Sequence, residues 1–252
     1  MHVRSTRPRT YVPAAAALTA ALALAAAPGS AQAAASCTFD AAGAKVAVDA
    51  SGLGTAARLS RTPGGAIQLD GAACGAATVT TTDTIVVTGG SGLQQIVVDL
   101  SGGAFAPGKT VETGTGAISE IELAVDGGTG LEFPLGDELR VVGGAAADTF
   151  RFTGKDVLLN ADSDADVTTT DVEALAAEGG GGADHLLGDG AAPASLPLRL
   201  DGGAADDVLA GGDADDVLEG GAGDDVETGN AGRDTFREGT AANGADSLDG
   251  GG

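Results

Sequence analysis

Residues 202–237 read GGAADDVLA, GGDADDVLE, GGAGDDVET and GNAGRDTFR, four consecutive blocks of nine residues with no slippage between them. Each block opens with a glycine, and these are Gly202, Gly211, Gly220 and Gly229. The sixth position is always an acid, and these acids are Asp207, Asp216, Asp225 and Asp234. Self-similarity at a fixed short period indicates a repeat architecture, in which each unit stacks on its neighbours.

More distant copies of the block lie on both sides of this stretch. They read GGAAADTFR at 143–151, GGGGADHLL at 179–187 and AANGADSLD at 241–249, and their sixth-position acids are Asp148, Asp184 and Asp246. The eighth position is a large apolar residue in most blocks, but Glu227 occupies it in the third consecutive block. We therefore expect the turn that contains Glu227 either to lie at the rim of the stack or to be a defect within it.

A block of nine residues has too few apolar side chains to fold alone, so its neighbours must stack on it to bury them. In a solenoid with two strands per turn, residues eighteen apart lie on adjacent turns, about 4.8 Å apart. Asp207 then lies beside Asp225, and Asp216 beside Asp234. Like charges at this separation repel, and a Ca²⁺ ion between them reverses the sign of the interaction.

The blocks resemble the hemolysin-type, or RTX, calcium-binding repeat, GGxGxDxUx, in which U is a large aliphatic residue. The resemblance implies an all-β fold, a right-handed parallel β-roll. In that fold the first six residues of each block form a Ca²⁺-binding turn, and the last three form a short strand with U facing inward. The implied metal ligands are Asp148, Asp184, Asp207, Asp216, Asp225, Asp234 and Asp246. Ala205 and Ala214 depart from the pattern because they replace the fourth-position glycine, where a positive φ favours glycine.

The region 36–142 is β-rich but less regular, and we expect a degenerate β-solenoid continuous with the roll of 143–252, or a small β-sandwich that caps it. Short runs of β-branched residues alternate there with Gly, Ser and Asp turns. Residues 89–96 keep the glycines of the block but carry Gln94 in place of the acid, so this turn is interpreted as one that has lost its metal. Residues 126–139 resemble one block interrupted by an insertion before Asp137.

Residues 1–35 have the features of a secretory signal peptide: a basic start, an apolar run over 12–27 and small-x-small patterns near Ala33. A retained membrane anchor is the alternative. Cys37 and Cys74 are the only cysteines, and an even pair in an exported chain most simply forms a disulfide. A lipidated Cys37, or two free thiols, would be the other outcomes.

The composition and motifs of the chain exclude several classes of binding partner and of enzyme. A formal net charge of -23 opposes binding to nucleic acid or, once the signal peptide is removed, to an anionic membrane. The single histidine beyond residue 35, His185, cannot form a zinc protease motif, and no G-x-S-x-G nucleophile elbow occurs. We therefore expect a secreted calcium-binding module with a structural or interaction role, and no enzyme. A polysaccharide lyase or hydrolase on a β-helix is the alternative.

The same composition also defines the competing outcome, an unfolded tract. Residues 201–252 carry fourteen carboxylates against two arginines, and high negative charge with few aromatic residues is typical of disorder. We expect disorder in this region without Ca²⁺ and order with it.

Overall fold

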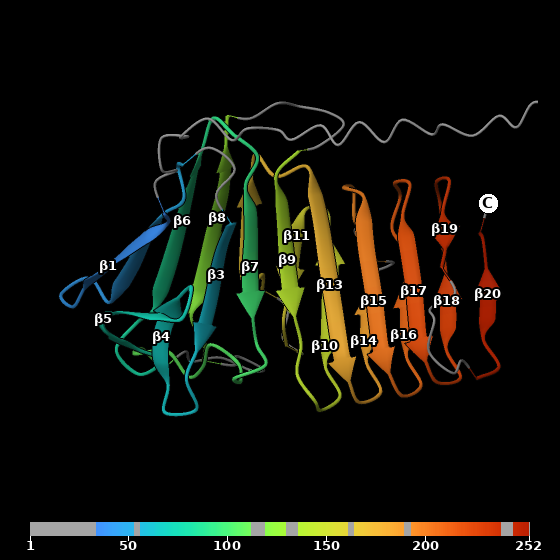
Figure 1. The fold of residues 1–252 in the computed structure, drawn as a ribbon, viewed down its shortest axis with the longest axis horizontal. Coiled ribbons are helices and arrows are strands. Elements are labelled where there is room, and N and C mark those ends of the chain that lie inside the picture. The colour runs from blue at the N-terminus through green and yellow to red at the C-terminus, as the bar shows by residue number, and fades with distance from the viewer. Residues whose placement is uncertain are drawn as a thin grey trace, which may run out of the picture. The chain divides into compact units, whose positions relative to one another are not determined.

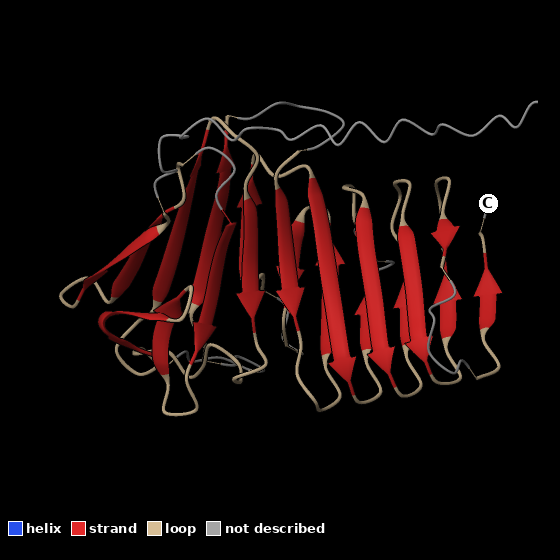
Figure 2. Cartoon of the chain, in the orientation of Figure 1, coloured by secondary structure: helices blue, strands red, loops and turns tan. Residues whose placement is uncertain are grey.

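The computed structural model describes residues 34–52, 56–111, 119–129, 136–160, 164–188, 193–237 and 244–251. The expected signal peptide falls almost entirely outside these residues. The regular structure of the described residues consists of β-strands, which form two sheets (Figures 1 and 2). Among these residues there is no helix of the length and apolar character that a membrane crossing requires.

The first sheet has eleven strands. In the order in which they lie side by side they are β1 (Ser36–Asp40), β2 (Lys45–Asp49), β6 (Thr84–Gly90), β8 (Glu122–Gly128), β12 (Val167–Thr170), β11 (Asp156–Leu158), β10 (Thr149–Thr153), β14 (His185–Leu187), β16 (Val208–Ala210), β18 (Val226–Thr228) and β20 (Ser247–Asp249).

The second sheet has nine strands. In spatial order they are β19 (Thr235–Phe236), β17 (Val217–Ala222), β15 (Leu198–Ala204), β13 (Ala174–Gly181), β9 (Glu138–Val142), β7 (Gln95–Asp99), β3 (Ala56–Arg61), β4 (Ala66–Leu69) and β5 (Ala72–Thr78). From β13 onward the chain alternates between the sheets at every strand, so each turn contributes one strand to each sheet.

The parallel register confirms the stacking that the sequence predicts. Val208 in β16 pairs with Val226 in β18, and Val217 in β17 pairs with Thr235 in β19, an offset of eighteen residues in both sheets. The inward apolar positions Leu186 and Leu209 are fully buried, with 0 % of their surface exposed. A two-sheet parallel roll is therefore the fold of the repeat region.

The region before residue 143 continues the same two sheets, so the fold there is a degenerate solenoid and not a separate sandwich. β8 pairs in parallel with β12, and β9 with β13, which carries both sheets across that position without a break. Inserted antiparallel strands lengthen two turns, namely β3–β4–β5 in the second sheet before residue 143, and β10–β11–β12 in the first sheet shortly after it.

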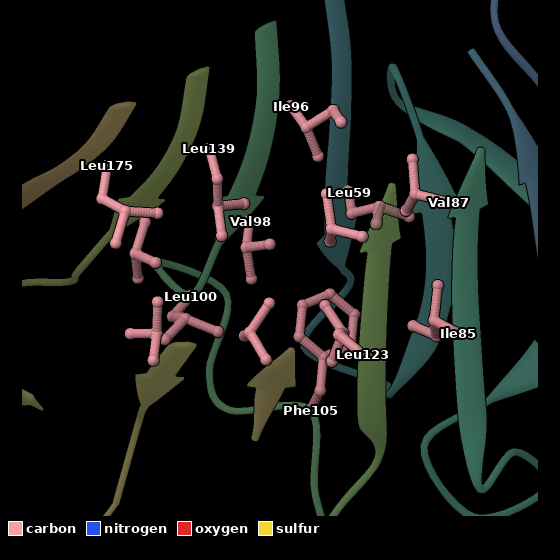
Figure 3. Close-up of a cluster of buried hydrophobic side chains, with 14 of the residues drawn as sticks. Leu59, Ile85, Val87, Ile96, Val98, Leu100, Phe105, Leu123, Leu139 and Leu175 are labelled. Carbon is pink, nitrogen blue, oxygen red and sulfur yellow. The ribbon is translucent and has the colours of Figure 1, made fainter. Parts of the chain in front are cut away.

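The core lies between the two sheets and is thin and mostly aliphatic. Figure 3 shows side chains from both sheets that point toward one another, including Ile85 and Leu123 from the first sheet and Ile96 and Leu139 from the second. Alternate residues of each strand face inward, which is the periodicity of a half-buried strand. With only six phenylalanines in the chain, this narrow interior is filled chiefly by Leu, Ile, Val and Ala.

Glu227 interrupts the apolar column of the first sheet. It aligns with Leu209 on one side and Leu248 on the other, and only 3 % of its surface is exposed. Leu248, in the next turn, is 46 % exposed. The turn that the sequence marks as irregular therefore has a carboxylate, that of Glu227, at an inward position, and it lies next to the edge strand β20.

A disulfide joins Cys37 in β1 to Cys74 in β5. These are edge strands of the two different sheets, so the bond connects the sheets at the amino-terminal end of the roll. The pairing predicted from the sequence is present, and no free cysteine occurs in the described residues.

Candidate metal centre

The sixth-position acids lie in two rows, one along each edge of the roll where the chain passes between sheets. In the first row the backbone amide of each acid donates a hydrogen bond to Oδ1 of the acid in the next turn. The donors and acceptors are Asp148 to Asp184 at 2.6 Å, Asp184 to Asp207 at 2.7 Å, Asp207 to Asp225 at 2.8 Å and Asp225 to Asp246 at 3.1 Å. Five of the seven predicted acids are thus connected through direct hydrogen bonds.

The other two predicted acids form the second row, on the opposite edge. The amide of Asp216 donates to Oδ1 of Asp234 at 3.0 Å, across the expected eighteen residues. The preceding turn contributes no acid, because the amide that donates to Asp216 Oδ1, at 2.7 Å, belongs to Leu198. This row is therefore shorter in the repeat region than the first.

The second carboxylate oxygen has no hydrogen-bond partner in most of these acids. The Oδ2 atoms of Asp184, Asp207, Asp225 and Asp234 are buried without one. None of the three ion pairs in the described part of the chain involves a sixth-position acid. An unpaired buried carboxylate oxygen is strongly unfavourable, so each of these atoms needs a cation or a proton.

The first-position glycines allow oxygen atoms of two adjacent turns to approach the backbone closely. A Cβ atom on Gly202 would lie within 3.0 Å of both Asp207 Oδ2 and the carbonyl oxygen of Gly220 in the next turn. The same two neighbours, one carboxylate and one carbonyl oxygen, border the space over Gly143, Gly179 and Gly211. Any side chain at this position would fill a space that oxygen atoms from two adjacent turns surround.

The turns fall into two conformations. In the blocks that begin at 179, 202, 220 and 229, the second and fourth residues both have a positive φ; they are Gly180 and Gly182, Gly203 and Ala205, Gly221 and Gly223, and Asn230 and Gly232. In the blocks at 143 and 211 neither residue is among those with a positive φ. Ala205 therefore adopts the conformation that favours glycine, with φ of 85°, whereas Ala214 avoids it.

The turn conformation decides what the second carboxylate oxygen contacts. In the blocks at 143 and 211 the second-position amide turns inward and donates to Oδ2, from Gly144 to Asp148 at 2.8 Å and from Gly212 to Asp216 at 2.6 Å. In the four blocks with positive φ this bond is missing, and Oδ2 is unpaired. The positive-φ turns thus leave a carboxylate oxygen available to an ion.

The electrostatics of the rows disfavour ionised carboxylates in the absence of a cation. The pKa of Asp207 is raised to about 6, mainly by burial and also by the charges of Asp184 and Asp225, while the hydrogen bond from the Asp184 amide opposes the shift. Burial likewise raises the pKa of Asp216 to about 6. The pKa values of Asp184 and Asp225 are also raised, again mainly by burial. A bound cation would reverse this preference.

The donor set fits Ca²⁺. Carboxylate and backbone carbonyl oxygens from two adjacent turns are the hard, oxygen-only ligands that Ca²⁺ takes in numbers of six to eight. Zn²⁺ favours nitrogen and sulfur ligands in tetrahedral sites, whereas the unpaired atoms of these acids are carboxylate oxygens.

A further row of acid-like positions lies on the edge that carries Asp216 and Asp234, but closer to the amino terminus. The amide of Gln94 donates to Asp137 Oδ1 at 2.6 Å, and the amide of Asp137 donates to Glu173 Oε2 at 2.7 Å. Gln94 Oε1 accepts the Gly90 amide at 3.1 Å, as Asp148 and Asp216 accept theirs. The blocks of Gln94 and Asp137 are recognisable in the sequence but predict no metal site, and no sequence pattern predicted that Glu173 would join them.

Comparison with known proteins agrees with this geometry. Residues 200–236 match the family model of the RTX calcium-binding nonapeptide repeat, in four copies. No curated protein and no solved structure matches the chain. The matched residues include the four consecutive blocks almost completely, together with the acids Asp207, Asp216, Asp225 and Asp234.

Proposed function

We propose that this chain, an RTX-type calcium-binding repeat protein, is an exported module. Its repeat turns become ordered when they bind extracellular Ca²⁺. In this proposal Asp184, Asp207, Asp225 and Asp234 each supply a free carboxylate oxygen to an ion held between adjacent turns. Asp148, Asp216 and Asp246 belong to the same rows and complete the ligand set with carboxylate oxygens that also accept hydrogen bonds. Turn carbonyl oxygens provide the remaining ligands.

The observation that carries the proposal is the buried, unpaired Oδ2 atom, which recurs in four turns with one backbone conformation. A single unpaired buried oxygen would be an isolated feature of one turn. Four equivalent ones, each beside a glycine and three of them in a single hydrogen-bonded row, support a shared ligand. A cation would compensate all four oxygens while the carboxylates stay ionised, so a cation is the ligand that we propose.

The energetics support folding that depends on the ion. Ordering the turns opposes folding by roughly 1–2 kcal/mol of backbone entropy per residue. Each block offers one inward apolar side chain, which contributes about 1.5–3 kcal/mol when buried. An ion that binds only the stacked state adds RT ln(1 + [Ca²⁺]/Kd) per site. With extracellular-type Kd values of about 10⁻⁴–10⁻³ M, several sites must act together.

Export is part of the proposal because three features agree with it. The first 35 residues have a basic start, an apolar run and small-x-small patterns, as secretory signals do. The Cys37–Cys74 disulfide suits an oxidising compartment. Extracellular Ca²⁺ also reaches the millimolar range that weak turn sites require.

The test is a Ca²⁺ titration of the disulfide-bonded protein, starting at residue 36, followed by circular dichroism and small-angle scattering. We expect β signal and compaction to rise together and cooperatively as Ca²⁺ approaches the millimolar range, with an expanded carboxy-terminal half in chelator. Mg²⁺ at equal ionic strength serves as the control for charge screening. Equal compaction in chelator and in millimolar Ca²⁺ would refute the proposal.

A further inference from the structure

We infer that a calcium site lies outside the family-matched repeats, between the turn of Asp137 and the turn of Glu173. The inference rests on the proposed function, since it uses the same ligand chemistry. It concerns Asp137, Asp171 and Glu173, which precede the residues 200–236 that the repeat model matches.

The turn that precedes Asp137 begins with two glycines, and the second has the positive φ of the matched repeats. Gly127 takes the first position and Gly128 the second, and the φ of Gly128 is 93°, close to the 102° of Gly203. A Cβ atom on Gly127 would clash with the carbonyl oxygen of Asp171 and would lie 3.0 Å from Asp137 Oδ2. The space over Gly127 therefore has the same two neighbours as the space over Gly202, one carboxylate oxygen and one carbonyl oxygen of the next turn.

The carboxylate of Asp137 is buried and half-satisfied, as in the positive-φ repeats. Only 1 % of the residue is exposed, its Oδ1 accepts the Gln94 amide, and its Oδ2 has no hydrogen-bond partner. Its own amide donates to Glu173 Oε2, which brings a second carboxylate to the same place. The nearby arginine, Arg140, is engaged by Glu138 and Glu178.

These observations give the ion at least three protein oxygens from two adjacent turns. They are Asp137 Oδ2, the carbonyl oxygen of Asp171 and the carboxylate of Glu173. Burial raises the pKa of Asp137, as it does in the matched repeats, so this carboxyl too requires compensation. The competing arrangement uses no ion: the side-chain amide nitrogen of Gln94 is buried without a partner, and rotation could direct it to Asp137.

The experiment counts bound Ca²⁺ by isothermal titration calorimetry on the full mature, disulfide-bonded protein. Asp137→Asn keeps an oxygen for the Gln94 amide but removes the charge, and Glu138→Gln removes the same charge one residue away on the outer face of the sheet. We expect Asp137→Asn and Glu173→Gln each to bind one calcium ion fewer than the parent, and Glu138→Gln to bind the parent number.

Hydrogen exchange provides a second measurement that does not depend on the stoichiometry. Ca²⁺ should slow amide exchange in 136–142 and 167–175 of the parent, and Asp137→Asn should abolish this effect while leaving Ca²⁺ protection of 198–237 intact. Unchanged stoichiometry together with unchanged protection in Asp137→Asn would overturn the inference and favour the Gln94 contact. If Asp225→Asn also left the calcium stoichiometry and the Ca²⁺-dependent protection unchanged, the proposed function itself would fail. The Asp225→Asn variant therefore distinguishes failure of the inference from failure of the proposed function.

Discussion

The backbone amide of Asp207 donates a 2.8 Å hydrogen bond to Oδ1 of Asp225, the residue eighteen positions later. One carboxylate oxygen therefore holds two turns together, and the other, Oδ2, has no hydrogen-bond partner and is the proposed ion ligand. In this proposal stacking and ion binding act through the same side chain. Because each block has so little apolar surface, we expect the order of the roll to depend on the ligand.

Substitution of Asp225, which has a neighbouring acid on each side in the first row, should weaken Ca²⁺-dependent folding more than substitution of Asp246 at the end of the row. Asp225→Ala removes the acceptor for the Asp207 amide and an ion ligand, and a hydrogen bond to a charged group contributes about 1.5–3 kcal/mol. We expect the Ca²⁺ midpoint of the circular dichroism titration to rise severalfold or more for Asp225→Ala, and less for Asp246→Ala. Equal midpoints would contradict the row geometry.

Ala205→Gly should stabilise the Ca²⁺-bound roll, because Ala205 has a φ of 85°. A non-glycine residue at positive φ carries roughly 1 kcal/mol or more of backbone strain, which glycine relieves. Part of this gain is lost because glycine gives the unfolded chain more conformational entropy. Ala214→Gly is the matched control: it makes the same change at the same block position without a positive φ and should destabilise by about 0.5–1 kcal/mol. Urea unfolding in saturating Ca²⁺ measures both, and shifts of the same sign would show that the two turns do not differ.

In the absence of Ca²⁺, the repeat region should gain order as the pH falls. The pKa values of Asp207 and Asp216 are about 6 in the folded state, above the ordinary 3.8, so the folded state binds protons more tightly. Stability from this source is fully present below about pH 4 and is lost as the pH rises through about 6. Circular dichroism of calcium-free protein at pH 4.5 and 7.5 checks this, with more β signal expected at pH 4.5.

In the proposed sites protons and Ca²⁺ compete for the same oxygens, so the Ca²⁺ midpoint should rise as the pH falls below about 6. Titrations at pH 5 and 7.5 at constant ionic strength measure the shift. A midpoint that does not change with pH would mean that these carboxyls are not the ligands.

Removal of the disulfide should destabilise the amino-terminal end of the roll and spare the Ca²⁺ response of the repeats. The bond closes a separation of 37 residues, which corresponds to about 4 kcal/mol in the chain-entropy model. In the Cys37→Ser/Cys74→Ser variant, hydrogen exchange in Ca²⁺ should accelerate in 36–49 and 72–78. Exchange in 198–237 should stay near that of the parent; acceleration there as well would indicate one cooperative unit.

The sequence was sufficient where the period is unbroken. The nine-residue spacing predicted that Asp207 lies beside Asp225 and Asp216 beside Asp234, and both pairs are present. The even pair of cysteines was enough to predict the disulfide. In these cases the local pattern determines the contact, because each turn touches only its neighbours.

Outside residues 202–237, segments inserted between the blocks obscure the nine-residue spacing. Asp148 and Asp184 are adjacent in the row although 36 residues separate them, because the β10–β11–β12 hairpin lies in between. Asp137 and Glu173 are likewise 36 residues apart. The two turn conformations also escape prediction, since Ala205 and Ala214 share a block position and have different backbones.

The covalent link between β1 and β5 suggests an order in which the parts of the roll lose and regain structure. Because the disulfide holds the two sheets together where no repeat acid is needed, the amino-terminal rungs can persist as a template when Ca²⁺ is withdrawn. Formation of the first turn is the slow step when a stack is built from a free coil, and a retained amino-terminal end would remove that step. On return of the ion the repeats would then add to existing strands in a fixed register, so we expect refolding to proceed from the disulfide-linked end.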